Sequence, residues 1–242
     1  CDSFLAAGNA YAEYMKYLGA PEDKIFFARF CADHDYLHNE YLRLRPFKDE
    51  IKKKKGYPEI VILFSGRFVW YKGITVLLNA YKRLQSEMNN IGLVLLGSGP
   101  ERRKYENYVI SNKLKNVFFE GFAQQEELSE YYIASDIFVL PSLSDTWGIV
   151  VNEAMAFGLP VISTDAAGVT YDLVKDGVNG FVVKAGDAEE LYNALKKICE
   201  NRELRKKMEE KSLEIIKDYT PANWAKSFIE AVKYILNNKC RK

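Results

Sequence analysis

Short apolar runs alternate with amphipathic stretches over most of the chain, and this alternation restricts the fold more than any other feature. The run "EIVILFS" at 59–65 is followed by an amphipathic stretch at 74–88, and the run "IGLVLLG" at 91–97 by another at 101–114. Strands and helices in this order are typical of a parallel sheet covered by helices. Four further apolar runs begin at residues 116, 136, 159 and 179. The pattern predicts an α/β fold with a doubly wound, Rossmann-like parallel sheet of about six strands.

The rest of the chain divides into two flanking parts. Beyond Asp187 the sequence is helical in character, and Pro221 marks the start of a final helix. Residues 1–55 carry aromatic-rich helical patches and end in four consecutive lysines, for which we expect a solvated loop. We therefore predict a linker with the tail of a further unit at 1–55, a Rossmann-like domain at 56–219 and a carboxyl-terminal helix at 220–242.

Composition excludes several classes of function. The 34 Lys and Arg residues balance 33 acids, so nothing favours nucleic acid as a partner. Cys1, Cys31, Cys199 and Cys240 are scattered without metal-ligand spacing, which argues against a metal site or a disulfide framework and favours the cytoplasm. No apolar stretch reaches the roughly 18 residues that a bilayer span needs, so peripheral contact with the inner face of a membrane stays open.

Two cations follow the first predicted strand of the domain. Gly66 allows a sharp turn after Ser65, and Arg67 and Lys72 stand in the loop before the next helix. Ligands of open α/β sheets bind outside the carboxyl ends of the strands. The planar fork of arginine and the compact charge of lysine together suit a diphosphate. A surface loop with two solvated charges is an equally good interpretation of these residues alone.

The second strand is followed by the turn Gly97-Ser98-Gly99 and another predicted helix. The spacing resembles a dinucleotide-binding turn, but Arg102 stands where that motif requires a third glycine. Taken alone, the segment predicts a tight turn.

A third constellation lies in "PSLSDTWGIVVNEAMAFGLPVI" at 141–162, where a loop with Asp145 leads into a helix that starts near Gly148. The first amides of that helix, around Gly148, Ile149 and Val150, form a potential anion site. Glu153 lies further along the same helix. Because carboxylates beside a phosphate need hydrogen-bond donors, sugar hydroxyls of a nucleotide sugar suit them. The alternative is that Asp145 caps the helix and Glu153 lies on a solvated face.

Taken together, these motifs resemble the retaining glycosyltransferases of family 4, which have the two-domain GT-B fold. The resemblance covers roughly residues 59–235 and includes "KDGVNGFVV" and Trp224. It implies that the chain is the carboxyl-terminal, donor-binding half, that the amino-terminal domain is missing, and that the last helix crosses back to it. The implied catalytic residues are Asp145, Arg67 and Lys72, and the implied donor-binding residues are Gly66, Gly97, Gly148, Ile149, Val150 and Glu153.

The resemblance further implies a reaction without metal or cofactor, in which a sugar moves from a nucleoside diphosphate such as a UDP- or GDP-sugar to a glycan or lipid-linked acceptor. The isolated fragment is expected to bind donor without appreciable transfer. Asp145 departs from the glutamate that is usual in the family, which leaves open a non-catalytic nucleotide-sugar-binding or assembly module. A sugar-nucleotide epimerase of the same fold is a third alternative.

Overall fold

The computed structural model describes residues 1–239, apart from the side chains of Gln125, Glu126 and Lys239, so that Cys240 and the end of the predicted 220–242 segment lie outside the described residues. A six-stranded parallel sheet forms the centre, in the order β5-β4-β3-β6-β7-β8. The strands are β3 (Ile60–Ser65), β4 (Ile91–Leu96), β5 (Val117–Gly121), β6 (Ile137–Leu140), β7 (Val161–Thr164) and β8 (Gly180–Val183). The predicted doubly wound parallel sheet is confirmed, and each predicted strand is present.

The strands are almost wholly apolar because the sheet is covered on both faces. Along β3, Val61 and Leu63 belong to one core cluster while Ile62 and Phe64 belong to the other, as expected where successive side chains point to opposite faces. The first face packs against α2 (His34–Leu44), α6 (Gln125–Ile133), α7 (Val150–Ala156) and α10 (Arg202–Ile216). The second packs against α4 (Ile74–Glu87), α5 (Arg102–Ser111) and α9 (Ala188–Glu200).

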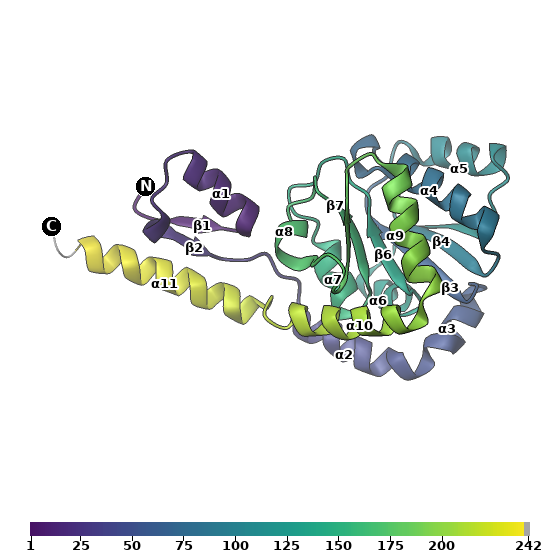
Figure 1. The fold of residues 1–242 in the computed structure, drawn as a ribbon. Helices are drawn as coiled ribbons and strands as arrows, with labels where there is room; N and C mark the ends of the chain where they lie inside the picture. Colours follow the sequence, from purple (N-terminus) through teal and green to yellow (C-terminus); the bar gives the residue numbers. More distant parts are fainter. Residues whose placement is uncertain (240–242) are drawn as a thin grey trace.

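A small lobe stands beside the sheet domain and joins the two ends of the chain (Figure 1). It contains β1 (Phe4–Ala6), α1 (Asn9–Tyr17), the 3-10 turn Glu22–Lys24, β2 (Ile25–Phe27) and the long α11 (Pro221–Lys239), with β1 and β2 paired in parallel. Helix α11 packs on β2, where the ring of Tyr234 lies against Phe26 at 5.5 Å. The lobe therefore unites residues that are two hundred positions apart in sequence.

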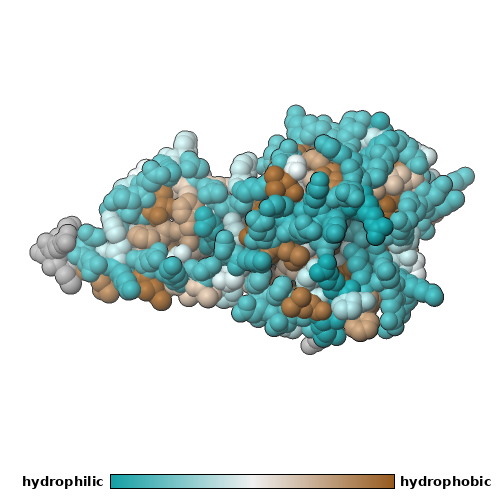
Figure 2. All heavy atoms as spheres, turned by 60° about the horizontal axis from the view of Figure 1, so that its bottom comes forward, coloured by the Kyte–Doolittle hydropathy of each residue, from teal (hydrophilic) through white to brown (hydrophobic). Residues whose placement is uncertain are grey.

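The last helix exposes apolar side chains. Trp224, Phe228, Ile229 and Leu236 are all exposed. Apolar side chains lie along the edge of the lobe in the space-filling view (Figure 2). This surface differs from that of the sheet domain, which is mostly hydrophilic in the same view.

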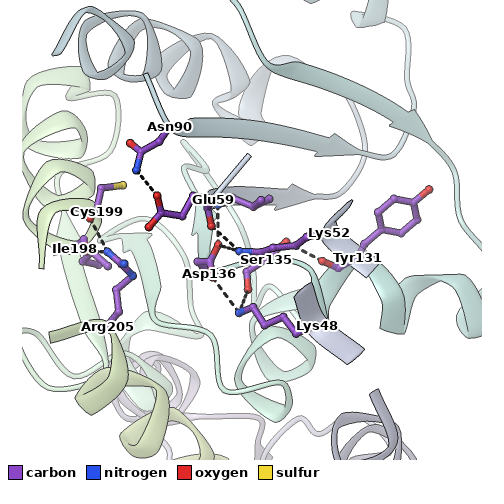
Figure 3. Close-up of polar contacts among 11 residues, drawn as sticks. Lys48, Lys52, Glu59, Asn90, Tyr131, Ser135, Asp136, Ile198, Cys199 and Arg205 are labelled. Atoms are coloured by element: carbon purple, nitrogen blue, oxygen red, sulfur yellow. Dashed lines mark hydrogen bonds and ion pairs between the residues drawn. The ribbon is translucent and has the colours of Figure 1, made fainter. Parts of the chain in front are cut away.

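The predicted solvated loop at the lysine run is wrong. Residues Lys48–Lys55 form α3, which follows the 3-10 turn Arg45–Phe47, and Lys52 is only 8% exposed. Its Nζ donates to Asp136 Oδ2 and to the Glu59 carbonyl, while Lys48 Nζ lies 3.0 Å from Asp136 Oδ1 (Figure 3). Asp136 Oδ2 also accepts the Val61 amide at 2.8 Å. The Asp136 carboxylate thus holds α3 against the sheet. The domain boundary at residue 55 stays a prediction.

Candidate functional site

The site lies where the strand order reverses. The chain runs outward from β3 through β4 to β5 on one side, and from β6 through β7 to β8 on the other, so β3 and β6 are central neighbours. The loops that follow β3 and β6 diverge from this point, which leaves a crevice outside the carboxyl ends of the two strands. Gly66 and Arg67 follow β3 and Asp145 follows β6, so two predicted constellations meet at this edge.

A cavity of about 810 Å³ opens at this edge, within the range of about 300–1,000 Å³ that is usual for ligand sites. Six of the nine predicted site residues line it: Gly66, Arg67, Gly97, Ile149, Val150 and Glu153. Lys72, Asp145 and Gly148 are not among its lining residues, although Gly148 directly precedes Ile149.

The two glycine turns that the sequence places thirty residues apart are in direct contact. The Gly66 amide donates to the Leu96 carbonyl at 3.0 Å, and the Phe68 amide donates to the Ser98 carbonyl at 2.9 Å. Gly97 has φ +130°, and a Cβ there would lie 2.0 Å from the Gly66 carbonyl oxygen. Glycine at 97 is therefore required for the two loops to form one continuous floor of the cavity.

The two predicted cations, Arg67 and Lys72, differ in whether an acid already binds them. Arg67 is exposed at the cavity, and among the side chains and backbone groups that the structure describes its guanidinium has no hydrogen bond or ion pair. Lys72, at the end of the 3-10 turn Trp70–Lys72, places Nζ 2.6 Å from Asp145 Oδ2. Arg67 is thus available to an anion, while Lys72 is already paired.

The loop that holds Asp145 is hydrogen-bonded through its backbone to residues 166–168. The Asp145 amide donates to Ala166 O at 3.1 Å, and its carbonyl accepts the Gly168 amide at 3.0 Å. Asp145 does not cap α7, because the helix begins at Val150 after Ile149 and has no side-chain cap. Gly148 has φ +100°, and a Cβ there would lie 2.6 Å from Leu140. The turn into α7 therefore brings backbone amides to the cavity, and within the described residues those of Gly148 and Ile149 donate no hydrogen bond.

Glu153 is half-buried rather than on a solvated face. Its Oε2 accepts a hydrogen bond of 2.6 Å from the hydroxyl of Tyr132 in α6, which also lines the cavity. Burial raises the pKa of the Glu153 carboxyl, and the hydrogen bond from Tyr132 acts in the opposite direction. Burial also raises the pKa of Tyr132 well above its usual value, so the phenol is a neutral donor.

Sequence reasoning missed two walls of the cavity. One follows the edge strand β5 and continues into α6, and its residues are Phe122, Ala123, Gln124, Leu128 and Tyr132. The other comes from the segment before α2 and from its first turn, with Ala32, Asp33 and Leu37. The position of 122–124 at the carboxyl end of a predicted strand was a usable signal. The sequence of residues 32–37 contains no such signal, because only tertiary packing brings this part of the linker to the cavity.

The small lobe contacts the back of the loop that holds Asp145. Tyr11 of α1 donates its hydroxyl to Thr146 O at 3.0 Å, and Trp147 packs edge-on against Phe30 at 5.7 Å. Asn152 joins the two sides, since it accepts from Trp147 Nε1 at 3.0 Å and donates to Phe30 O at 3.1 Å. The loop is therefore held between the lobe and the sheet domain.

A second set of contacts between the amino-terminal residues and the sheet domain lies at α8 (Thr170–Leu173). The buried Asp172 accepts the Asn9 amide at the start of α1 at 2.8 Å, and its other oxygen lies 3.6 Å from Arg29 Nε. Burial raises the pKa of Asp172, against the opposing effects of the Asn9 amide and the Arg29 charge. The lobe is fixed to the sheet domain through a desolvated carboxylate.

Two further properties bear on the chemistry. Among the side chains that the structure describes, no group of three or more His, Cys, Asp or Glu could hold a metal ion. In the described part of the chain, no helix combines the length and the apolar character that crossing a bilayer requires. The polar groups that line the cavity include the Arg67 guanidinium, the Glu153 carboxylate and the backbone at the start of α7, a set that suits a phosphorylated ligand with hydroxyl groups.

The family model described as "Glycosyl transferases group 1" matches residues 47–214. An uncharacterized glycosyltransferase of Methanocaldococcus jannaschii is 31% identical over 158 residues, which cover 65% of this chain and 43% of the relative. A putative colanic acid biosynthesis glycosyltransferase of Salmonella typhimurium is 28% identical over 197 residues, which cover 78% of this chain and 46% of the relative. The chain thus spans less than half of the length of these curated relatives.

A solved structure of similar fold is an Anabaena protein in complex with UDP. It superposes with a TM-score of 0.82 at 20% identity, over 96% of this chain and 64% of that chain. At this identity the likeness concerns the fold, and it extends over both the sheet domain and the lobe.

Proposed function

This chain belongs to the group 1 glycosyl transferases, and from that membership we propose that its cavity binds the nucleoside diphosphate of a sugar donor. The architecture is that of one half of a GT-B enzyme. The observation that carries the proposal is that one cavity is lined by the Arg67 guanidinium, which has no partner among the described residues, by the joined glycine turns and by the half-buried Glu153. A cation, backbone at the start of α7 and an acceptor for hydroxyls thus line the same cavity.

In the proposed complex, the diphosphate lies against Arg67 and the backbone at Gly66, Gly97 and Gly148–Val150, where glycines allow close approach. Glu153 accepts hydrogen bonds from the ribose hydroxyls. Asp145 lies on the other side of the α7 start and contacts the transferred sugar. Residues 122–124 after β5 line the same cavity as Glu153 and contact the base.

The chemistry proposed is transfer with retention of configuration, as in family 4, without metal or cofactor. When the bond between sugar and diphosphate breaks, negative charge develops on the departing phosphate oxygens. Arg67 and the amides at the start of α7 stabilise that charge, and Lys72 joins them when it leaves Asp145. Fixed donors in a cavity of low dielectric stabilise such charge far better than water does.

The whole protein is proposed to use a glycan or lipid-linked acceptor, in keeping with the polysaccharide role named for the Salmonella relative. The acceptor would contact a further amino-terminal domain placed against the exposed side of the lobe. A cytoplasmic enzyme with peripheral contact to the inner face of a membrane fits that acceptor. The present chain is expected to bind the donor and to transfer sugar at a negligible rate.

The test is calorimetric titration of this 242-residue chain with UDP, GDP and ADP. UDP is tried first because it occupies the Anabaena protein of similar fold. Binding of at least one nucleotide is expected, and Arg67→Ala should weaken it by about tenfold or more because a charge-assisted contact to phosphate is lost. Arg202→Ala, an exposed arginine at the start of α10, is the matched control.

No measurable binding of any of the three nucleotides would contradict the proposal, as would equal effects of the two arginine substitutions. Nucleotide binding combined with complete absence of turnover in a protein extended by its amino-terminal domain would instead favour the non-catalytic module.

A further inference from the structure

We propose that Tyr132 is a positioning residue that holds the Glu153 carboxylate toward the cavity and thereby makes the site select ribonucleotides over 2′-deoxyribonucleotides. The inference rests on the proposed function, in which Glu153 accepts the ribose hydroxyls. It assigns the selectivity to a side chain in α6, a helix that carries none of the residues expected to touch the donor.

The Tyr132 ring is fixed before any ligand arrives. It is 1% exposed and stacks on Phe157 with centroids 5.5 Å apart and an interplanar angle of 18°. It also lies against Phe138 of β6, with ring centroids 6.2 Å apart. Because the ring is packed against a strand and the end of α7, its hydroxyl has a fixed position.

That hydroxyl engages only one side of the carboxylate. It donates to Glu153 Oε2 at 2.6 Å, while Oε1 has no hydrogen-bond partner among the described residues. A carboxylate has about four lone-pair sites, so three remain for incoming donors. A ribose offers two adjacent hydroxyls and a 2′-deoxyribose offers one. The fixed carboxylate is therefore set to distinguish them.

The selectivity depends on the carboxylate being charged and unable to turn away. When a partly buried charged acceptor loses a donor, the cost is larger than for a solvated group, which can pair with water instead. Burial raises the pKa of Glu153, and the hydrogen bond from Tyr132 opposes this rise and favours the ionised form. Among the described residues, the other charged side chains that line the cavity are Arg67, after β3, and Asp33, before α2.

Without the Tyr132 hydroxyl, Glu153 would be free to rotate toward solvent or to take up a proton. Either change would remove the penalty for a missing 2′-hydroxyl. Affinity for UDP would then fall, while affinity for 2′-deoxy-UDP would stay nearly the same.

The experiment compares the dissociation constants of UDP and 2′-deoxy-UDP from acidic to neutral pH for the wild-type chain, Tyr132→Phe and Glu153→Gln. The matched control is Tyr105→Phe, since Tyr105 is equally buried and donates to a glutamate, Glu101, but does not line the cavity. Circular dichroism checks that each variant is folded.

We expect the wild-type chain to prefer UDP by about tenfold or more, the value of one hydrogen bond to a charged group. Tyr132→Phe should reduce this ratio to near one and move the acid limb of UDP binding to higher pH. Glu153→Gln should abolish both the preference and the acid limb. Tyr105→Phe should change neither, which separates positioning from a general effect on stability.

A folded Tyr132→Phe variant that keeps the wild-type ratio would overturn the inference, and so would an equal loss in Tyr105→Phe. If Tyr132→Phe does not fold, Phe157→Leu loosens the same ring and should lower the ratio, and an unchanged ratio there counts against the inference. If the wild-type chain binds UDP without preferring the ribose form, the inference fails while donor binding stands. If no nucleoside diphosphate binds, the proposed function fails and the inference with it.

Discussion

The ammonium group of Lys72 lies 2.6 Å from Oδ2 of Asp145, so the cation from the loop after β3 is neutralised by the acid from the loop after β6. Both side chains are largely buried, with 19% and 10% of their surfaces exposed. Asp145 and a bound diphosphate would therefore compete for the same ammonium group. If the site binds a nucleotide as proposed, we expect Asp145 to weaken that binding, because it holds the ammonium group of Lys72.

Asp145→Asn should tighten UDP binding by about three- to tenfold, since it frees Lys72 and removes a negative charge beside the anion site. Calorimetry at low and at high salt measures the effect, and the gain should shrink as salt screens the charges. Glu203→Gln, which removes one acidic charge from α10, serves as the control. Unchanged or weaker binding in Asp145→Asn would mean that the pair does not oppose the nucleotide.

Glu153→Gln should raise the free energy of unfolding by about 1 kcal/mol at neutral pH, while it weakens nucleotide binding. Burial raises the pKa of Glu153 above its ordinary value of 4.5. The folded state thus holds the proton more tightly than the unfolded state, and wild-type stability falls as pH rises through the folded pKa. Below 4.5 the carboxyl is neutral in both states, and the two proteins should converge. Urea unfolding across this range measures the difference, and a variant less stable at every pH would contradict the prediction.

Gly97→Ala should lower the free energy of unfolding by about 2 kcal/mol or more and abolish nucleotide binding. The new Cβ would meet the Gly66 carbonyl oxygen at 2.0 Å, so the two loops would have to separate. Gly177→Ala is the control, because Gly177 also has a positive φ of +72° but no atom lies within 4 Å of its Cβ position. The control should show a cost of only about 1 kcal/mol and unchanged binding. Equal binding losses in both variants would exclude the contact as the cause.

Asp136→Asn should destabilise the chain by about 3 kcal/mol at neutral pH, since it leaves the ammonium groups of Lys48 and Lys52 without their counter-charge. Burial alone would raise the pKa of Asp136, but the two lysines and the Val61 amide outweigh it and hold the pKa below 3.8. The contribution of Asp136 is therefore fully present above pH 3.8 and is lost as pH falls through the lower folded value. Urea unfolding against pH should show wild type and variant converging in acid, and a constant difference would contradict the assignment. Glu210→Gln, on the exposed side of α10, should behave as wild type.

The sequence predicts the strands well because the four central ones, β3, β4, β6 and β7, are buried along their whole length. A strand that is buried on both faces is a continuous apolar run, which is easy to recognise in the sequence. The sequence also predicts that Gly66, Gly97 and Glu153 share a site, because the carboxyl ends of parallel strands gather at one edge of the sheet. Neither inference needs long-range information.

Other features depend on partners that are distant in sequence. Four consecutive lysines predict a solvated segment, yet Lys52 is buried because Asp136 lies 84 positions further along the chain. Tyr132 has the pattern of any apolar helix residue, and its role follows only from its contact with Glu153. Strands β1 and β2 contain three residues each, too few for a periodic signal.

The ring of Phe30 contacts both Tyr11 and Trp147, and these contacts affect how chimeras between two such proteins can be made. A chimera that joined this sheet domain to the amino-terminal half of a relative at residue 56 would leave Trp147 and Asn152 facing residues selected for another loop. A graft that brought residues 9–55 and α11 along would keep the wall behind Asp145 intact. A working chimera would therefore have to include more than the sheet domain. Residues 9–55 and α11, from opposite ends of the chain, would have to be transferred with it.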